Sequence, residues 1–114
     1  MKKIILSSIV LAFIFTLSAV GQSKKSTYRY TVDLTEVVDD KVKVELLAPR
    51  ITSSEITFYL PKIVPGTYAI ADYGRFISEF KATDKKDKPL SVERVNDNTW
   101  KIKNASKLHK ISYW

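Results

Sequence analysis

The chain has 114 residues and a formal net charge of +7, with a single histidine and no cysteine. The lack of cysteine excludes a disulfide framework. Basic residues are spread among acidic ones rather than gathered in one tract, which disfavours a nucleic-acid-binding protein.

Residues 1–21 are typical of an export signal. Two lysines open the segment, an apolar stretch follows, and Ala19-Val20-Gly21 offers small residues for cleavage after Gly21. The apolar stretch is shorter than the ~20 residues that span a bilayer, so we expect cleavage rather than an uncleaved membrane anchor. The mature protein is then predicted to be periplasmic or secreted without membrane attachment, and residues 22–27 to form a flexible lead-in.

From residue 28 onward the apolar residues recur with period two, which predicts β-strands. The first two predicted strands are 28–35 and 42–46, and the Asp39-Asp40 pair predicts a turn between them. We expect an antiparallel hairpin with one buried face and one wet face. The residues expected on its buried face are Tyr28, Tyr30, Val32, Leu34, Val42, Val44 and Leu46. The third predicted strand, 55–60, directs Ile56, Phe58 and Leu60 inward.

A long loop, residues 60–75, follows the third strand. Pro65-Gly66 predicts a turn because proline presets φ and glycine accepts a positive φ. The loop is longer than a hairpin requires, which invites a binding or inter-domain role. Its candidate residues for such a role are Pro65, Gly66, Tyr68, Asp72, Tyr73 and Arg75. In the structural alternative, both tyrosines pack under the loop and Asp72 pairs with Arg75. Residues 71–77 could form a short helical turn.

Four more strands are predicted after the loop. Residues 76–82 alternate, 84–89 form a charged turn, 90–92 resume a strand, and 96–98 form a tight turn before 99–103. Phe80 and Trp100 are expected in the core on opposing strands. The last apolar run, 111–114, predicts a strand that is incomplete at the C-terminus, as in a fragment. The whole pattern predicts an all-β fold for residues 28–114, an antiparallel sandwich or saddle-like sheet of about seven strands.

The sequence contains no recognisable set of catalytic or metal-binding residues. His109 is the only histidine, no His-Glu-x-x-His helix is present, and no serine lies in a Gly-x-Ser-x-Gly elbow. The paired carboxylates of Asp39-Asp40 are a turn signature. We therefore predict no catalytic residue, no metal ligand and no cofactor in this chain.

The strands and the loop together resemble the N-terminal domain of glycyl-aminopeptidase-type zinc metallopeptidases, peptidase family sixty-one. The resemblance covers Tyr28 to Tyr113. Its marks are Pro65-Gly66-Thr67-Tyr68, Asp72-Tyr73-Gly74-Arg75, Phe80-Lys81-Ala82 with Asp84, Leu90, Trp100-Lys101-Ile102 and Ile111-Ser112-Tyr113. Asp87 departs from the pattern where a glycine would suit the turn, although aspartate also tolerates such turns.

The resemblance implies an exported enzyme of a Gram-negative bacterium with a β domain, a zinc catalytic domain and a PDZ domain. In such enzymes two histidines and a glutamate hold zinc, and a second glutamate activates water for hydrolysis of N-terminal glycyl or alanyl bonds. None of these residues can be carried onto this sequence. The expected partners are the missing catalytic domain and, in the parent enzyme, a peptide substrate. A standalone secreted binding module that uses the Tyr68–Arg75 loop, and a relic of a disrupted gene, remain as alternatives.

Overall fold

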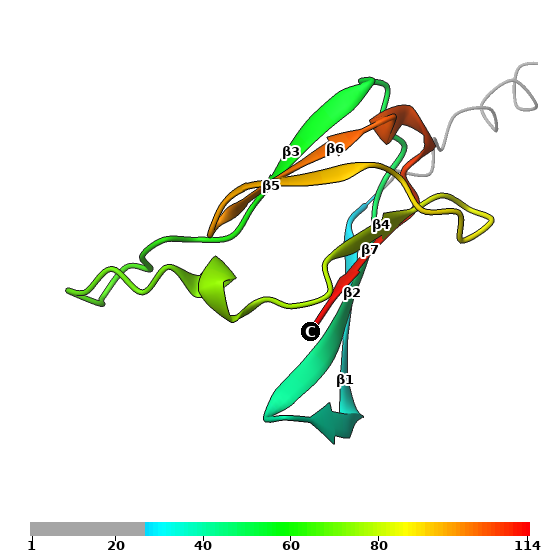
Figure 1. Ribbon diagram of the computed structural model, residues 1–114. Helices are drawn as coiled ribbons and strands as arrows, with labels where there is room; N and C mark the ends of the chain where they lie inside the picture. The colour runs from blue at the N-terminus through cyan, green and yellow to red at the C-terminus, as the bar shows by residue number, and fades with distance from the viewer. Residues whose placement is uncertain (1–26) are drawn as a thin grey trace, which may run out of the picture.

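The computed structural model describes residues 27–114, so the predicted signal segment and nearly all of the predicted lead-in lie outside the described residues. Seven strands form two antiparallel sheets that face each other as an open sandwich (Figure 1). The strands are β1 (Arg29–Val38), β2 (Lys41–Leu47), β3 (Glu55–Tyr59), β4 (Lys81–Thr83), β5 (Val92–Asn96), β6 (Thr99–Lys103) and β7 (Lys110–Tyr113). The order in the four-stranded sheet is β1-β2-β7-β4, and in the three-stranded sheet β3-β6-β5. The predicted all-β class is confirmed.

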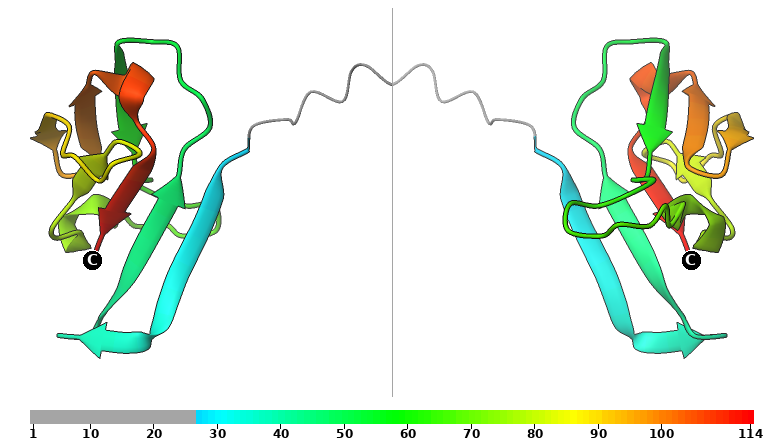
Figure 2. Two further views of the ribbon diagram at one scale, coloured as in Figure 1. Left: turned by 90° about the vertical axis from the view of Figure 1, so that its right-hand side faces the viewer. Right: turned by 90° about the vertical axis from the view of Figure 1, so that its left-hand side faces the viewer.

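The β1–β2 hairpin forms where the period-two pattern predicts it. Tyr30 pairs with Leu46 and Val32 with Val44. Asp39 and Asp40 form the turn with φ values of 50° and 59°, the left-handed backbone that a two-residue hairpin turn requires. The hairpin extends beyond the three-stranded sheet as a long ribbon (Figure 2).

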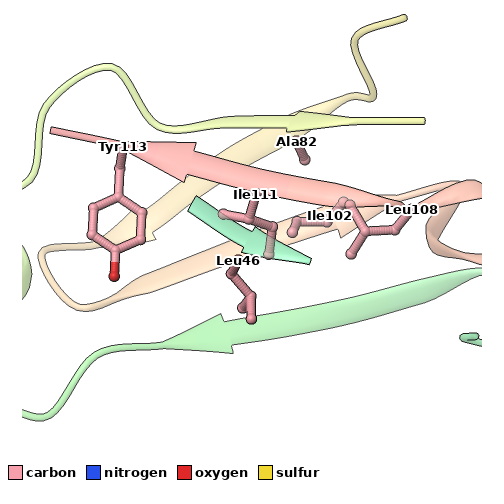
Figure 3. Packing of buried hydrophobic residues seen from close by; sticks show 6 residues of the cluster. All are labelled: Leu46, Ala82, Ile102, Leu108, Ile111 and Tyr113. Atoms are coloured by element: carbon pink, nitrogen blue, oxygen red, sulfur yellow. The ribbon is translucent and has the colours of Figure 1, made fainter. Parts of the chain in front are cut away.

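The core lies between the two sheets and is small. Its buried members are Leu46, Ala82, Ile102, Leu108, Ile111 and Tyr113, which come from both sheets and from the segment before β7 (Figure 3). Three aromatic side chains pack beside these residues. The rings of Phe80 and Trp100 stack with their centroids 4.8 Å apart, and the centroid of the Phe58 ring lies 5.4 Å from that of Phe80. The predicted core position is confirmed for Trp100, which is 2% exposed on β6, whereas Phe80 is half-buried and precedes β4 instead of lying on a strand.

One predicted strand, 76–82, is wrong over most of its length. The chain forms a short 3₁₀ helix at Tyr73–Phe76, where a helical turn was expected, and only Lys81–Thr83 are a strand. Glu79 has a φ of 49°, which breaks extended structure. Ser78 instead exchanges backbone hydrogen bonds with Trp114, N–O 2.8 and 3.0 Å. The apolar and polar residues of 76–82 alternate in the sequence although the segment is bent. A period of two in such a short stretch therefore does not prove a strand.

The predicted burial of the hairpin is also wrong for β1. The exposed fractions are 58% for Tyr30, 50% for Val32 and 74% for Leu34, whereas Leu46 of β2 is 2% exposed. Within residues 27–114, the hydrophobic cluster takes no member from β1. The three-stranded sheet covers β2, β7 and β4 but leaves the edge strand bare, so period two alone did not reveal which strands would be covered.

Candidate functional site

The loop between β3 and the 3₁₀ helix projects from the sandwich as an arm, residues 61–72 (Figure 1). Gly66 has a φ of 89°, and the Thr67 amide and hydroxyl both donate to the Val64 carbonyl, at 3.2 and 2.9 Å. The predicted Pro65-Gly66 turn therefore forms the tip of the arm. Tyr68 is 105% exposed, so it points fully into solvent.

Backbone hydrogen bonds close the base of the arm. The amides of Ala71 and Asp72 both donate to the Lys62 carbonyl, each at 3.0 Å, and the Tyr73 amide donates to Pro61 at 3.3 Å. The two sides of the loop are thus tied together below its tip. These hydrogen bonds hold the two sides of the arm together at its base, so the arm has a defined shape.

Asn98, in the β5–β6 turn, fastens the arm to the sandwich. Its side-chain oxygen accepts from the Gly74 amide at 2.8 Å, and its side-chain nitrogen donates to the Asp72 carboxylate at 2.8 Å. Its backbone carbonyl accepts from the Leu60 amide at 2.9 Å. We call Asp72, Gly74, Arg94 and Asn98 the latch, because Arg94 also donates to the Gly74 carbonyl at 3.0 Å.

Gly74 lets the arm approach the turn closely. An added Cβ at this position would lie 2.0 Å from the backbone oxygen of Asp97 and 2.8 Å from the Cα of Asn98. No side chain fits there without moving backbone. Glycine is therefore needed at residue 74 for the close approach of two chain segments.

The structural alternative, in which Asp72 pairs with Arg75 and both tyrosines pack under the loop, is not what the structure shows. The Asp72 carboxylate is bonded to Asn98, and the Arg75 guanidinium carbon lies 4.5 Å from the Phe76 ring centroid. Tyr68 does not pack under the loop, whereas Tyr73 is half-buried at its base. The six candidate residues are therefore divided: Pro65, Gly66 and Tyr68 lie at the tip of the arm, Asp72 at its base, and Tyr73 and Arg75 in the 3₁₀ helix that follows.

Sequence reasoning missed Asn98 and Arg94 as partners of the loop. Asn98 was assigned only to a tight turn, and Arg94 was not singled out. The available signal was weak: asparagine is common in turns, and its role as a bridge depends on a segment 24 residues earlier in the chain.

An open depression of about 440 Å³ lies beside the latch, lined by Tyr59, Leu60, Lys62, Asp72 and residues 96–99. A larger one of about 680 Å³ lies at the opposite end of the strands, where His109 and several basic residues meet. Among the residues that the structure describes, no three His, Cys, Asp or Glu side chains gather as a metal site. No helix within the described range is long and apolar enough to cross a membrane.

The Asn98→Asp substitution is expected to loosen the arm. It removes the donor to Asp72 and sets two carboxylates against each other, so we expect a loss of about 1–3 kcal/mol in the free energy of unfolding. Hydrogen exchange should quicken over residues 60–76, as measured by mass spectrometry. Asn96→Asp is the matched control, because its side-chain oxygen only accepts, from the Asn98 amide. Equal effects of the two variants would show that the Asn98–Asp72 bond does not hold in solution.

The charged turn at 84–89 forms as predicted, around the Asp84 carboxylate. This group accepts from the amides of Lys86 and Lys88, at 2.8 and 3.0 Å, and these hydrogen bonds hold its pKa below the usual range. Asp87 has a φ of 57°, so aspartate does take the left-handed position there.

A carboxyl with a lowered folded-state pKa stabilises the fold above its unfolded pKa, and this contribution is lost as the pH falls through the folded value. We expect the stability advantage of the native chain over Asp84→Asn to be present near neutral pH and to shrink below about pH 4. Urea unfolding at a series of pH values measures it. An advantage that grows on acidification would contradict the assignment.

The family model described as Peptidase M61 N-terminal domain matches residues 29–114. No curated protein matches the chain. A solved structure with the same fold is an aminopeptidase N family protein from Idiomarina loihiensis, at a TM-score of 0.67 and 20% identity, over 76% of this chain and 14% of that one. The chain thus spans about a seventh of the solved protein's length.

Proposed function

Because the chain belongs to the family of the peptidase M61 N-terminal domain, we propose that it is the non-catalytic β domain of an exported zinc aminopeptidase of the glycyl-aminopeptidase type. Its role is to support the catalytic domain and to border the cleft in which peptides are cut. The solved neighbour supports this placement in a larger enzyme, because a domain of this fold makes up only a small part of that aminopeptidase-family protein.

The observation that carries the proposal is the latched arm. Its tip exposes Tyr68 fully and Ile70 to 63%, while its base is fixed to the sandwich by the hydrogen bonds of the latch. Fixing a solvent-exposed aromatic tip in this way has no evident benefit for the sandwich alone. It does suit contact with a neighbouring domain or with a bound peptide, since rigid scaffolds position recognition loops.

The zinc of such an enzyme would be held elsewhere in the polypeptide. The described residues do not fit a zinc site, because no three potential ligands lie together and His109 interacts with its surroundings through its backbone, which bonds to Thr83 and Ala48. Under this proposal, the residues that hold zinc and activate water belong to the catalytic domain of the longer polypeptide. Export by the segment at residues 1–21 is part of the proposal.

The test begins with the gene. A His-Glu-x-x-His frame downstream of codon 114 is expected, and the longer polypeptide should release N-terminal glycine or alanine from peptides in a zinc-dependent way. In that protein, Tyr68→Ala should mainly weaken domain docking or stability, with Tyr59→Ala on β3 as the matched control for an exposed tyrosine. A gene that ends at Trp114 and yields a stable, independently functional product would refute the proposal.

The exposure of Tyr68 also favours a second candidate, a secreted binding module that uses the same arm for a partner or a glycan. This alternative is supported if the chain alone folds stably and its gene contains no peptidase domain. Loss of peptide turnover in Tyr68→Ala at unchanged stability would instead indicate direct substrate recognition by the arm.

A further inference from the structure

The inner face of the four-stranded sheet continues from the buried core onto β1. Tyr30 lies opposite Leu46, which lies opposite Ile111 on β7, and Val32 lies opposite Val44, which lies opposite Tyr113. Directly opposed residues of antiparallel strands share one face of the sheet. The side chains of β1 therefore extend the same face that carries the core.

This shared face is covered over only part of its width. Leu46 and Ile111 are 2% and 1% exposed, because the three-stranded sheet packs over them. Toward β1 the cover ends, and in both views of Figure 2 the hairpin stands clear of the other sheet. We call the uncovered part the open face: Tyr30, Val32 and Val37 of β1, with the half-buried Val44 of β2 beside them.

Across residues 31–33 and 43–45, the opposite face of the same hairpin is polar, and its carboxylates have partners. Thr35 donates through its amide and its hydroxyl to Asp33, at 2.9 and 2.6 Å. Glu45 forms ion pairs with Lys43 at 3.1 Å and with Lys110 at 3.9 Å. Both faces of β1 contact solvent in the described chain, but over this stretch only the opposite face has polar side chains that interact well with water. A row of exposed tyrosine and valine side chains on a solvated face marks an interaction surface.

We infer that the open face docks an apolar surface of another domain of the same longer polypeptide, and so extends the core of the sandwich across a domain boundary. This inference rests on the proposed function. Two observations favour that occupant over a separate partner. First, the open face is continuous with the core of the domain. Second, the matched family is described as an N-terminal domain, and the shared part makes up only 14% of the solved neighbour's chain.

The experiment compares two neighbouring substitutions on β1. Val32→Lys places a charge on the open face, and Thr31→Lys places the same charge on the polar face, opposite Glu45. Both positions are exposed and both original side chains are β-branched. Each variant is made in the longer polypeptide and in the 114-residue chain, and thermal unfolding and gel filtration are measured for all.

In the longer polypeptide, Val32→Lys is expected to lower the Tm by about 5 °C or more, because a lysine is forced into an apolar interface. Thr31→Lys should leave the Tm within about 1 °C. In the 114-residue chain the two variants should differ little, since Val32 is 50% exposed among the residues that the structure describes. A Tm shift of Val32→Lys that occurs only in the longer polypeptide would indicate that position 32 contacts another domain.

Equal shifts for the two variants in the longer polypeptide would overturn the inference, while zinc-dependent peptidase activity would still uphold the proposed function. A dimer of the 114-residue chain that Val32→Lys dissociates would also overturn it, by identifying a second copy as the occupant. A gene without a further domain would overturn both, and the reading frame alone distinguishes that case.

Discussion

Replacing Ile102 by alanine is expected to lower the free energy of unfolding by about 2–5 kcal/mol. Ile102 is 0% exposed and lies on the central strand of the three-stranded sheet, between Ile56 of β3 and Val92 of β5. Its side chain enters the core cluster from that sheet (Figure 3). Alanine would remove three carbon atoms from a fully buried position of a small core and leave a cavity between the two sheets.

Urea denaturation followed by tryptophan fluorescence measures this loss, since Trp100 lies two residues away on the same strand. Total stabilities of domains are about 5–15 kcal/mol, so the variant should lose a large fraction of the stability of the domain. Val95→Ala on β5 is the control, because Val95 is 53% exposed and its truncation should cost less than about 0.5 kcal/mol. A loss at Ile102 no larger than that of the control would contradict the two-layer packing described above.

Replacing Gly74 by alanine is expected to cost about 1–3 kcal/mol and to release the arm from the sandwich. The new Cβ would collide with the backbone of Asp97 and Asn98, which has no flexible side-chain end that could move aside. Separating the segments breaks the bond from the Gly74 amide to Asn98 and strains the bond from Arg94 to the Gly74 carbonyl. Limited proteolysis within residues 61–77 should therefore become faster.

Gly66→Ala is a useful comparison for Gly74→Ala. Nothing lies within 4 Å of an added Cβ at residue 66, but its φ of 89° strains any other residue. We expect about 1 kcal/mol there, from the left-handed backbone alone, with the base of the arm intact. If Gly66→Ala exposed residues 72–76 to exchange as much as Gly74→Ala does, the close contact at Gly74 would not be what holds the arm.

Local chemistry accounts for the features that the sequence predicts well. Alternation predicted the β1–β2 hairpin, β3 and β6, whereas the strand expected at 90–92 shares only Val92 with β5. Asp39-Asp40 and residues 96–98 predicted the two hairpin turns, and Pro65-Gly66 predicted the tip of the arm. The resemblance to the peptidase family is confirmed by the family model over residues 29–114. Each of these depends on residues near one another in the chain, where side-chain type directly limits φ and ψ.

Long-range contacts account for what the sequence did not show. Alternation at 76–82 predicted a strand, because apolar spacing does not record the positive φ of Glu79 or the bonds from Ser78 to Trp114. The expected Asp72–Arg75 pair gave way to Asn98, which competes from another turn.

The sequence by itself determined the class of fold, the hairpins and the family, because strand period and turn residues are local properties. Only the tertiary structure decided that the second sheet stops short of β1 and that Asn98 fastens the arm. The burial of β1 depends on how far the two sheets overlap. The attachment of the arm depends on contacts between Asn98 and residues 24 to 26 positions earlier in the chain.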